Sequence, residues 1–241
     1  MTVRVQCWSG PRNISTAFMY SWAQRADTTV VDEPLYAAYL ARFDRGHPMT
    51  AEVLASQSQD PAAVIEDVIL GPVGTPVLFC KQMAHHLRDL DTAFLGETEN
   101  LLLTRHPVDM LRSLSAQLPH CDLDDTGLPE QVQLVDDLIA AGGRPIVVDS
   151  QVLLDDPRGM LAALCERLGL SFDEAMLSWS PGPKPYDGVW AAVWYANVHR
   201  STGFGPPRTP NREPLPEHLG PVLAAAEPLY ERLAAHAVSA P

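Results

Sequence analysis

Five short segments rich in apolar residues, separated by stretches with helical patterns, constrain the fold of this chain most strongly. Segments of this kind are typical of a parallel sheet that helices cover on both faces. The predicted strands are Val3–Cys7, Thr28–Asp32, Pro76–Lys81, Asn100–Thr104 and Pro145–Asp149. The predicted helices are Ile14–Arg25, Leu35–Phe43, Ala62–Ile69, Val108–Leu118, Leu128–Ala141, Pro157–Leu168 and Pro221–Ala235. The pattern therefore predicts a three-layer α/β domain with a mainly parallel central sheet of about five strands.

Length and charge limit the class of protein. With 241 residues the chain is expected to form a single domain, residues 1–241, and 46% hydrophobic residues suffice for a large core. The formal net charge of −13 argues against a general nucleic-acid binder, which needs a basic patch. Any site for a highly charged anion must therefore be local and built from a few converging Arg and Lys side chains.

Cysteine usage and hydropathy predict a cytoplasmic protein. The four cysteines are scattered, and no CxxC pair indicates a zinc or redox site. The N-terminus begins with a strand rather than a signal sequence, and no apolar run approaches the roughly 18 residues of a membrane span. We therefore expect a reducing compartment and no membrane partner.

The carboxyl ends of the predicted strands carry the candidate functional residues. In open α/β sheets, ligands bind beyond these ends. Arg12, Lys81 and Arg105 place a cation at or just past three of the five strand ends, in a chain that is otherwise acidic. This clustering indicates a site for an anionic ligand at that edge of the sheet.

The segment Cys7–Thr16 joins the first strand to the first helix through a loop of a size that fits a phosphate. A Ser-Gly-Pro turn ends the strand, and the N-terminus of the following helix offers free N–H groups. Arg12, Ser15 and Thr16 add one cation and two hydroxyls, so the loop is expected to hold a phosphate or sulfate. The chain has no Gly-Lys pair, which excludes a Walker A loop. The alternative is an ordinary strand–turn–helix with Asn13 or Ser15 as the N-cap.

A second segment, Leu101–Ser113, also leads from a buried strand into a helix. Arg105 lies at the end of the strand, and Pro107 fixes the entry into the helix. Ser113 follows about two turns into that helix. An arginine fork and a hydroxyl together make a good phosphate contact.

Both segments together resemble the sulfotransferases that use 3′-phosphoadenosine-5′-phosphosulfate (PAPS), over roughly Val3 to Val148. The resemblance implies a P-loop-like fold with PAPS as the co-substrate. It implies that the first loop binds the 5′-phosphosulfate, with the matching residues Pro11, Arg12, Ser15 and Thr16. It also implies that Arg105 and Ser113, together with Pro107, form the site for the 3′-phosphate.

Three departures from the family's pattern stand out. Asn13-Ile14 stand where Ser-Gly is usual, and both residues are still expected to contact the nucleotide. Arg12 stands where cytosolic members often have Lys. The C-terminal Arg-Lys-Gly element is absent, and Arg200–Phe204 is expected to close over the nucleotide in its place.

The resemblance also implies a catalytic base. Related bacterial proteins that act on small metabolites often have a Glu-Pro pair after the second strand, which makes Glu33 the candidate and Asp32 the alternative. Capping of the following helix by both carboxylates is the structural interpretation. Lys81 and Arg12 would stabilise charge on the transferring group and the leaving oxygen. For Lys81, an ion pair with Asp32 or Glu33 is equally compatible with the sequence.

The histidines are weaker candidates for the base. His85 and His86 follow Lys81 closely, and either is an alternative to Glu33. His106 is expected to orient rather than to react, and His199 could face the site. No His, Cys or Asp set has the spacing of a metal site, so no metal is expected.

Residues 179–216 are rich in Pro and Gly and are predicted to form a loop-rich lid or substrate segment. Within it, Trp190, Trp194 and Tyr195 have the spacing of one helix face. They either pack in the core or form a lid over adenine or the acceptor. An exposed aromatic segment of this kind would permit a homodimer.

The sequence is interpreted as that of an enzyme that moves a sulfuryl group from PAPS to a hydroxyl or amine of a small-molecule acceptor. Residues 35–74 and those after 179 are expected to form the acceptor pocket. Two other functions stay open. A nucleotide-dependent kinase would need magnesium ligands, for which Asp149 is the candidate. A non-catalytic relative would bind a nucleotide or metabolite without turnover.

Overall fold

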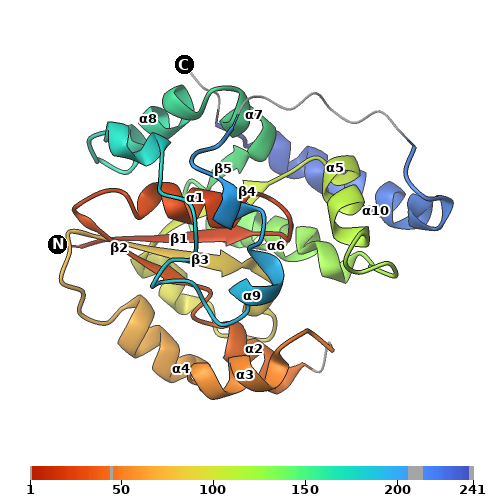
Figure 1. The fold of residues 1–241 in the computed structure, drawn as a ribbon, viewed down its shortest axis with the longest axis horizontal. Helices are drawn as coiled ribbons and strands as arrows, with labels where there is room; N and C mark the ends of the chain where they lie inside the picture. Colours follow the sequence, from red (N-terminus) through yellow and green to blue (C-terminus); the bar gives the residue numbers. More distant parts are fainter. Residues whose placement is uncertain (1, 44–45, 206–213, 239–241) are drawn as a thin grey trace.

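Five parallel strands form one central sheet in the described part of the chain (Figure 1). A computed structural model describes residues 2–43, 46–205 and 214–238. The strand order is β2-β3-β1-β4-β5, and every pairing is parallel. The strands are β1 (Val3–Ser9), β2 (Thr28–Asp32), β3 (Val77–Met83), β4 (Glu99–Thr104) and β5 (Ile146–Asp149). All five predicted strands are therefore present.

Helices cover both faces of the sheet, which confirms the predicted three-layer α/β architecture. The first face carries α1 (Ser15–Trp22), α7 (Ser150–Asp155) and α8 (Pro157–Arg167). The second face carries α4 (Pro61–Val64), α5 (Pro107–Ser115), α6 (Leu128–Ala140) and α10 (Gly220–Ala234).

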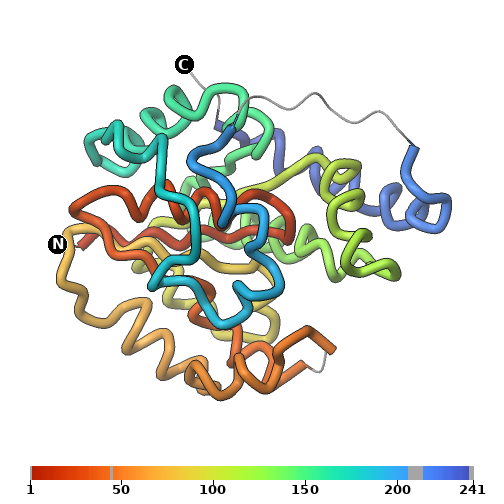
Figure 2. The backbone as a smooth tube through the Cα atoms, in the orientation of Figure 1, coloured from red at the N-terminus to blue at the C-terminus, as the bar shows by residue number. Residues whose placement is uncertain are grey.

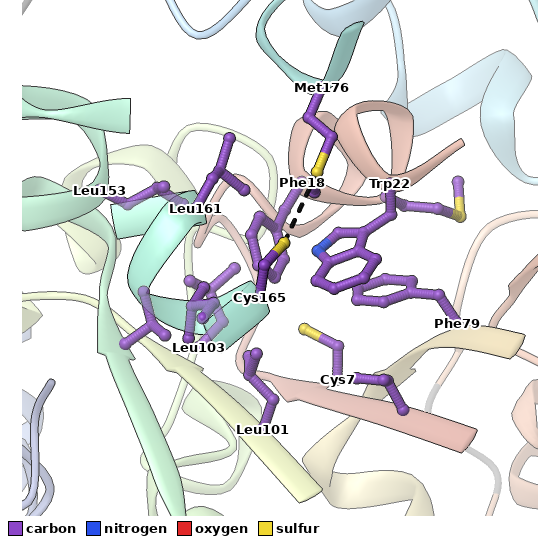
Figure 3. Packing of buried hydrophobic residues seen from close by; sticks show 14 of the residues in the cluster. Cys7, Phe18, Trp22, Phe79, Leu101, Leu103, Leu153, Leu161, Cys165 and Met176 are labelled. Atoms are coloured by element: carbon purple, nitrogen blue, oxygen red, sulfur yellow. Dashed lines mark hydrogen bonds between the residues drawn. The ribbon is translucent and has the colours of Figure 1, made fainter. Parts of the chain in front are cut away.

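The two faces have separate hydrophobic cores because side chains alternate along each strand. In β1, Val5 and Cys7 pack under α1 and α8, whereas Trp8 points into the opposite core. Figure 3 shows the first core, where the rings of Trp22 and Phe79 stack with centroids 5.0 Å apart. All four cysteines are free and buried, as expected for small apolar residues in a core.

A third, smaller core lies beside the carboxyl edge of the sheet. It joins α2 (Tyr36–Arg42) and α3 (Thr50–Ser56) to the short α9 (Ala191–Trp194). The segment 179–205 leaves α8, runs across the sheet, forms α9 and turns back (Figure 2). The remainder of the predicted lid includes residues 206–213, which lie outside the described residues.

Several elements differ from the sequence-based prediction. The predicted helix Ala62–Ile69 is a short α4 followed by a π-helix, η1 (Ile65–Ile69), and α3 and α7 were not predicted. Short 3-10 helices complete the structure: η2 (Ala84–Leu87), η3 (Ala93–Glu97), η4 (Asp124–Thr126), η5 (Glu174–Leu177), η6 (Val198–Arg200) and η7 (Glu217–Leu219). Among the described helices, none combines the length and the apolar character that crossing a membrane requires.

The strand order places a crevice at the end of β1. Its neighbours are β3 and β4, and the chain passes from one side of β1 to the other between these two strands. The helices that follow β1 and β4 pack on opposite faces, since Phe18 of α1 lies in the first core and Met110 of α5 in the second. Ligands of open α/β sheets bind at such a switch point. Figure 1 shows α2, α5 and α9 gathered around the side toward which β1 and β3 point.

Candidate functional site

A cavity of about 780 Å³ opens at the carboxyl edge of the sheet. The loop after β1, the ends of β2 and β3, the loop after β4, α5 and the α9 segment all contribute to its wall. Ten of the residues expected from the sequence to bind the nucleotide or to act in catalysis line it: Pro11, Arg12, Asn13, Ile14, Ser15, Thr16, Glu33, Lys81, Arg105 and Ser113. Pro107, which was expected to help form the 3′-phosphate site, begins α5 and does not line the cavity. The fold thus brings together residues up to 102 positions apart in the chain.

The loop between β1 and α1 presents an uncapped helix N-terminus to this cavity. Arg12 and Ile14 adopt left-handed backbone conformations, with φ of 62° and 60°. Ile14 is the N-cap residue and makes no side-chain capping bond, and the first backbone bond of α1 runs from Phe18 N–H to Ile14 O. The expectation of Asn13 or Ser15 as N-cap is therefore wrong. The first N–H groups of α1 have no acceptor within the helix and form a place where an anion is stabilised.

The side chain of Asn13 binds the neighbouring strand β4 instead of capping α1. Its side-chain amide is buried and donates a hydrogen bond of 2.9 Å to the carbonyl oxygen of Leu103 in β4. Its main-chain oxygen accepts a bond from the Ser150 hydroxyl, which also reaches Thr104 in β4. The loop is thereby fixed to the neighbouring strand, and its shape is set before any ligand binds.

Arg105 and Ser113 connect the second predicted segment to the first. The Arg105 guanidinium donates through Nη1 to the main-chain oxygen of Arg12, at 2.7 Å. The Arg12 guanidinium donates through Nε to Ser113 Oγ, at 2.9 Å. Burial lowers the pKa of Arg12, because desolvation penalises its charge, and an anion beside it would offset that penalty. Two guanidinium groups therefore lie beside the uncapped end of α1.

A buried cluster of charges lies at the end of β2 and β3. The Lys81 ammonium donates to Asp32 Oδ1 at 3.0 Å, to Glu33 Oε1, and to the Tyr195 hydroxyl at 2.6 Å. Burial lowers the pKa of Lys81, but the carboxylates of Asp32 and Glu33 outweigh that effect and hold it well above its usual range. The ion pair that the sequence allowed for Lys81 is present with both carboxylates.

Neither Asp32 nor Glu33 caps α2, so the structural interpretation of these two carboxylates as helix caps is wrong. The N-cap of α2 is Leu35, without a side-chain bond. Both oxygens of Asp32 are used within the fold: the Tyr195 hydroxyl contacts both, and Gly188 N–H reaches Oδ2 at 3.1 Å. Of the two, Glu33 alone lines the cavity. Burial raises the pKa of Glu33, and the charge of Lys81 only partly counters it.

Aromatic and imidazole rings form the wall beyond Glu33. Tyr36 stacks on His86 with centroids 5.1 Å apart, and its hydroxyl is 2.9 Å from His47 Nδ1. Tyr39 packs against both His85 and His86 at 5.0 Å. Tyr36, Tyr39 and His47 come from the region expected to form the acceptor pocket, although the sequence did not single out His47, whereas His85 and His86 follow β3 and lie outside that region. Burial holds the pKa of His86 well below its usual range, so its ring is neutral.

The segment 179–205, which contains α9, forms a further side of the cavity wall. Trp190, Trp194 and Tyr195 line it, and Trp190 and Tyr195 are at the same time buried members of the third core. These aromatic side chains therefore pack in a core and form part of the cavity wall at the same time. From the segment Arg200–Phe204, expected to close over a nucleotide, Ser201, Gly203 and Phe204 line the cavity.

Further residues considered from the sequence lie outside the cavity lining, among them His106, His199 and Asp149. His106 caps α5 and contacts the ring of Tyr230, and His199 binds Asp187 at 3.0 Å. Asp149 caps α7 and accepts a bond from Tyr230, so the magnesium ligand considered for a kinase is occupied elsewhere. Residues 2–43, 46–205 and 214–238 contain no His, Cys, Asp and Glu group suited to a metal ion.

The sequence did not identify the side of the cavity formed by α5 and the loop after it. Leu114, Gln117 and Leu118 line the cavity together with Ser113. Gln117 lies four residues after Ser113, just beyond the end of α5 at Ser115. A helix predicted to run to Leu118 would place both side chains on one face, and this repeat was the available signal. The acidic residues Asp122, Asp124 and Asp125 also line the cavity and had no such signal.

Comparison with known proteins gives matches over nearly the whole chain. The family model described as Sulfotransferase domain matches residues 3–237. Two curated proteins of Arabidopsis thaliana are similar, "Branched-chain-amino-acid aminotransferase-like protein 2" at 37% identity and "protein 1" at 38%, each over 234 residues and 96% of this chain. The chain spans only 41% and 42% of their lengths, so their other parts have no counterpart here.

Three solved structures with a similar fold are described as sulfotransferases or sulfotransferase domains. The sulfotransferase domain of the Synechococcus PCC 7002 olefin synthase has a TM-score of 0.57 at 19% identity, covering 96% of each chain. A sulfotransferase from Alicyclobacillus acidocaldarius has a TM-score of 0.58 at 14% identity, covering 98% of this chain and 95% of its own. The sulfotransferase domain of the curacin biosynthetic pathway has a TM-score of 0.52 at 15% identity, covering 93% and 97%.

Proposed function

The chain belongs to the sulfotransferase domain family, and we propose that it transfers a sulfuryl group from PAPS to a hydroxyl or amine of a small molecule. One observation carries this proposal. Arg105 holds the main chain of Arg12, and Arg12 in turn holds Ser113, beside the uncapped N-terminus of α1. Donors from two separate strand–helix units thus converge on one place, which suits a ligand with two phosphate groups.

The residues present fit PAPS. The loop Pro11–Thr16 and the first N–H groups of α1 would hold the 5′-phosphosulfate, with Arg12 as the cation. Arg105 and Ser113 would hold the 3′-phosphate. When bound, PAPS supplies an activated sulfuryl group on a bisphosphate that leaves. Positioning and electrostatic stabilisation by these side chains would provide most of the rate.

Glu33 is the proposed base for the acceptor. Its Oε1 is held by Lys81, and its carboxylate lies in the cavity wall between Lys81 and the ring of His86. In the proposed step the acceptor oxygen or nitrogen forms a bond to sulfur, the bond from sulfur to the 5′-phosphate breaks, and the acceptor proton moves to Glu33. Lys81 and Arg12 supply the positive charge that favours this shift of negative charge.

The acceptor would be a small metabolite, bound between Glu33 and the aromatic wall. A non-catalytic protein that binds nucleotide without turnover is the second candidate, because the anion site does not depend on Glu33. The kinase interpretation has little support, since the chain lacks a Gly-Lys pair and the carboxylate of Asp149 is engaged by α7 and Tyr230.

Calorimetric titration with 3′-phosphoadenosine-5′-phosphate (PAP), and with ADP for comparison, tests the proposal. We expect the wild type to prefer PAP, and Arg105→Ala to lose about 10- to 100-fold in affinity, as for a charged hydrogen bond to phosphate. Arg144→Ala is the matched control, because Arg144 is exposed and lies outside the cavity lining. Equal affinity for both nucleotides, or for neither, would remove the basis of the proposal.

A further inference from the structure

His86 combines complete burial with two ring nitrogens that find no hydrogen-bond partner among the residues that the structure describes. Its side chain is fully shielded from solvent, yet neither Nδ1 nor Nε2 makes a hydrogen bond within that part of the chain. The ring lines the cavity and is held flat against Tyr36, with 13° between the ring planes. A buried polar group without a partner is costly, and most such groups find one. The free nitrogens of His86 therefore point to a ligand atom in the cavity.

Glu33 places a carboxylate oxygen, Oε2, near Nε2 of His86. Its Oε1 is held by Lys81, whereas Oε2 has no hydrogen-bond partner in the described part of the chain and lies 3.9 Å from His86 Nε2. This distance is too long for a direct hydrogen bond. An oxygen atom placed about 2.8 Å from both atoms would bridge them with an angle of roughly 90°. The separation of these two atoms therefore matches the span of one bridging oxygen atom.

The charge states determine which atom can bridge. Burial above all, and then the positive charges of His85, His47, Lys81 and Arg42, lower the pKa of His86 and keep its ring neutral. A neutral ring carries one N–H, and the facing carboxylate favours that proton on Nε2. The site then offers a donor on His86 and an acceptor on Glu33. A hydroxyl can accept from the first and donate to the second, whereas an ammonium group has no lone pair to accept.

We infer that His86 is a positioning residue that selects a neutral hydroxyl as the acceptor group. This inference rests on the proposed function and makes it more specific. His86 Nε2–H donates to the acceptor oxygen and aligns its O–H with Glu33 Oε2, which takes the proton. His86 keeps its own proton throughout. The side chain thus favours alcohols over alkylamines, which are protonated at neutral pH.

Nitrogen NMR of protein labelled with [15N]histidine tests the contact directly. The signals of the His86 ring are those that the variant His86→Phe lacks. We expect these signals to report a neutral ring with its proton on Nε2. Its Nε2 signal should shift on addition of methanol and stay in place with methylammonium, which has the same size but only donors. A proton on Nδ1, no response to methanol, or an equal response to methylammonium would overturn the inference.

Paired variants separate positioning from a structural role. The amide nitrogen of Gln reaches the place of Nε2 and that of Asn the place of Nδ1, so His86→Gln should retain the methanol response and His86→Asn should lose it. With any alcohol that the wild type sulfates, His86→Asn and His86→Phe should raise KM about 10-fold, and His86→Gln less than about 3-fold. His236→Asn is the control, because His236 is exposed and outside the cavity lining.

The affinity for PAP distinguishes failure of this inference from failure of the proposed function. We expect the same PAP affinity in the wild type and in all three His86 variants. A loss of PAP binding in these variants would indicate a structural role and overturn the inference. If the wild type shows no preference for PAP, the proposed function fails, and the methanol titration of nucleotide-free protein still decides the role of His86.

Discussion

Glu33 is held in an environment that changes its proton affinity. The carboxyl is buried, and burial raises its pKa above the ordinary value of 4.5 in spite of the nearby Lys81 charge. As the pH falls through this raised pKa, Glu33 gains a proton and can no longer act as a base. We therefore expect the acid limb of the pH–rate profile to lie above pH 4.5. Lys81 stays protonated through neutral pH, since its own pKa is raised well above its usual range.

Carbon NMR of protein labelled with [13C]glutamate measures this titration without an acceptor. The Glu33 signal is the one that Glu33→Gln removes, and its midpoint should lie above 4.5. The same variant should bind PAP like the wild type and lose at least about 100-fold in turnover. A midpoint at or below 4.5, or full turnover in Glu33→Gln, would rule out Glu33 as the base.

The loop between β1 and α1 depends on close packing against η4, the 3-10 helix that precedes α6. A Cβ atom on Gly10 would lie 2.4 Å from the main-chain oxygen of Thr126, so alanine there forces the backbone to move. We expect Gly10→Ala to lower the free energy of unfolding by about 1–3 kcal/mol and to weaken PAP binding. Thermal unfolding and calorimetry measure both effects. Gly74→Ala is the matched control, because a Cβ atom there meets nothing within 4 Å; equal effects of both variants would contradict the argument.

Strands and the residues at their ends were predictable because they depend on local pattern and on one rule of sheet topology. The apolar runs predicted the strands. The rule that ligands bind beyond the carboxyl ends of the strands predicted that Arg12, Glu33 and Arg105 lie near one another, and all three line the cavity. Long-range contacts were not predictable. Asn13 looks like an N-cap in the sequence, but its amide binds Leu103 in a strand ninety positions away.

The length of a short helix was also not predictable from the sequence pattern alone. Trp190, Trp194 and Tyr195 have the spacing of one helix face, yet α9 contains only four residues, Ala191–Trp194. Trp190 and Tyr195 are instead held by contacts with α2 and with the carboxylate of Asp32. Tertiary packing decides such short elements, because they are too short to be stable alone.

The cavity as a whole has two chemically distinct ends. One end gathers Arg12, Arg105 and the uncapped end of α1, and the other combines the carboxylate of Glu33 with neutral rings. In a chain with a net charge of −13, this division keeps positive charge where the nucleotide phosphates are proposed to bind. Residues of the segment 179–205 also line this cavity, so the attachment of that segment to the sheet affects the site.

Tyr195 provides the attachment. Its hydroxyl accepts from Lys81 and from Trp190 Nε1 and contacts both oxygens of Asp32, which lies 163 positions away. Tyr195→Phe would leave these buried groups without that partner, and we expect it to lower the free energy of unfolding by about 1–3 kcal/mol. For a chain of this length, that corresponds to a fall in Tm of about 2–4 °C for each kcal/mol.

The local effect should exceed the global one, because the contact joins the C-terminal segment to the sheet. Hydrogen exchange at Gly188 N–H, which binds Asp32, should quicken in Tyr195→Phe more than exchange in β1 or β4. Tyr186→Phe is the matched control, because it removes a hydroxyl from a partly buried ring that packs edge-on against Tyr20. If Tyr195→Phe instead leaves exchange at Gly188 unchanged, or lowers Tm no more than Tyr186→Phe, the segment is held by the apolar packing of Trp190 against α2 rather than by the buried hydroxyl.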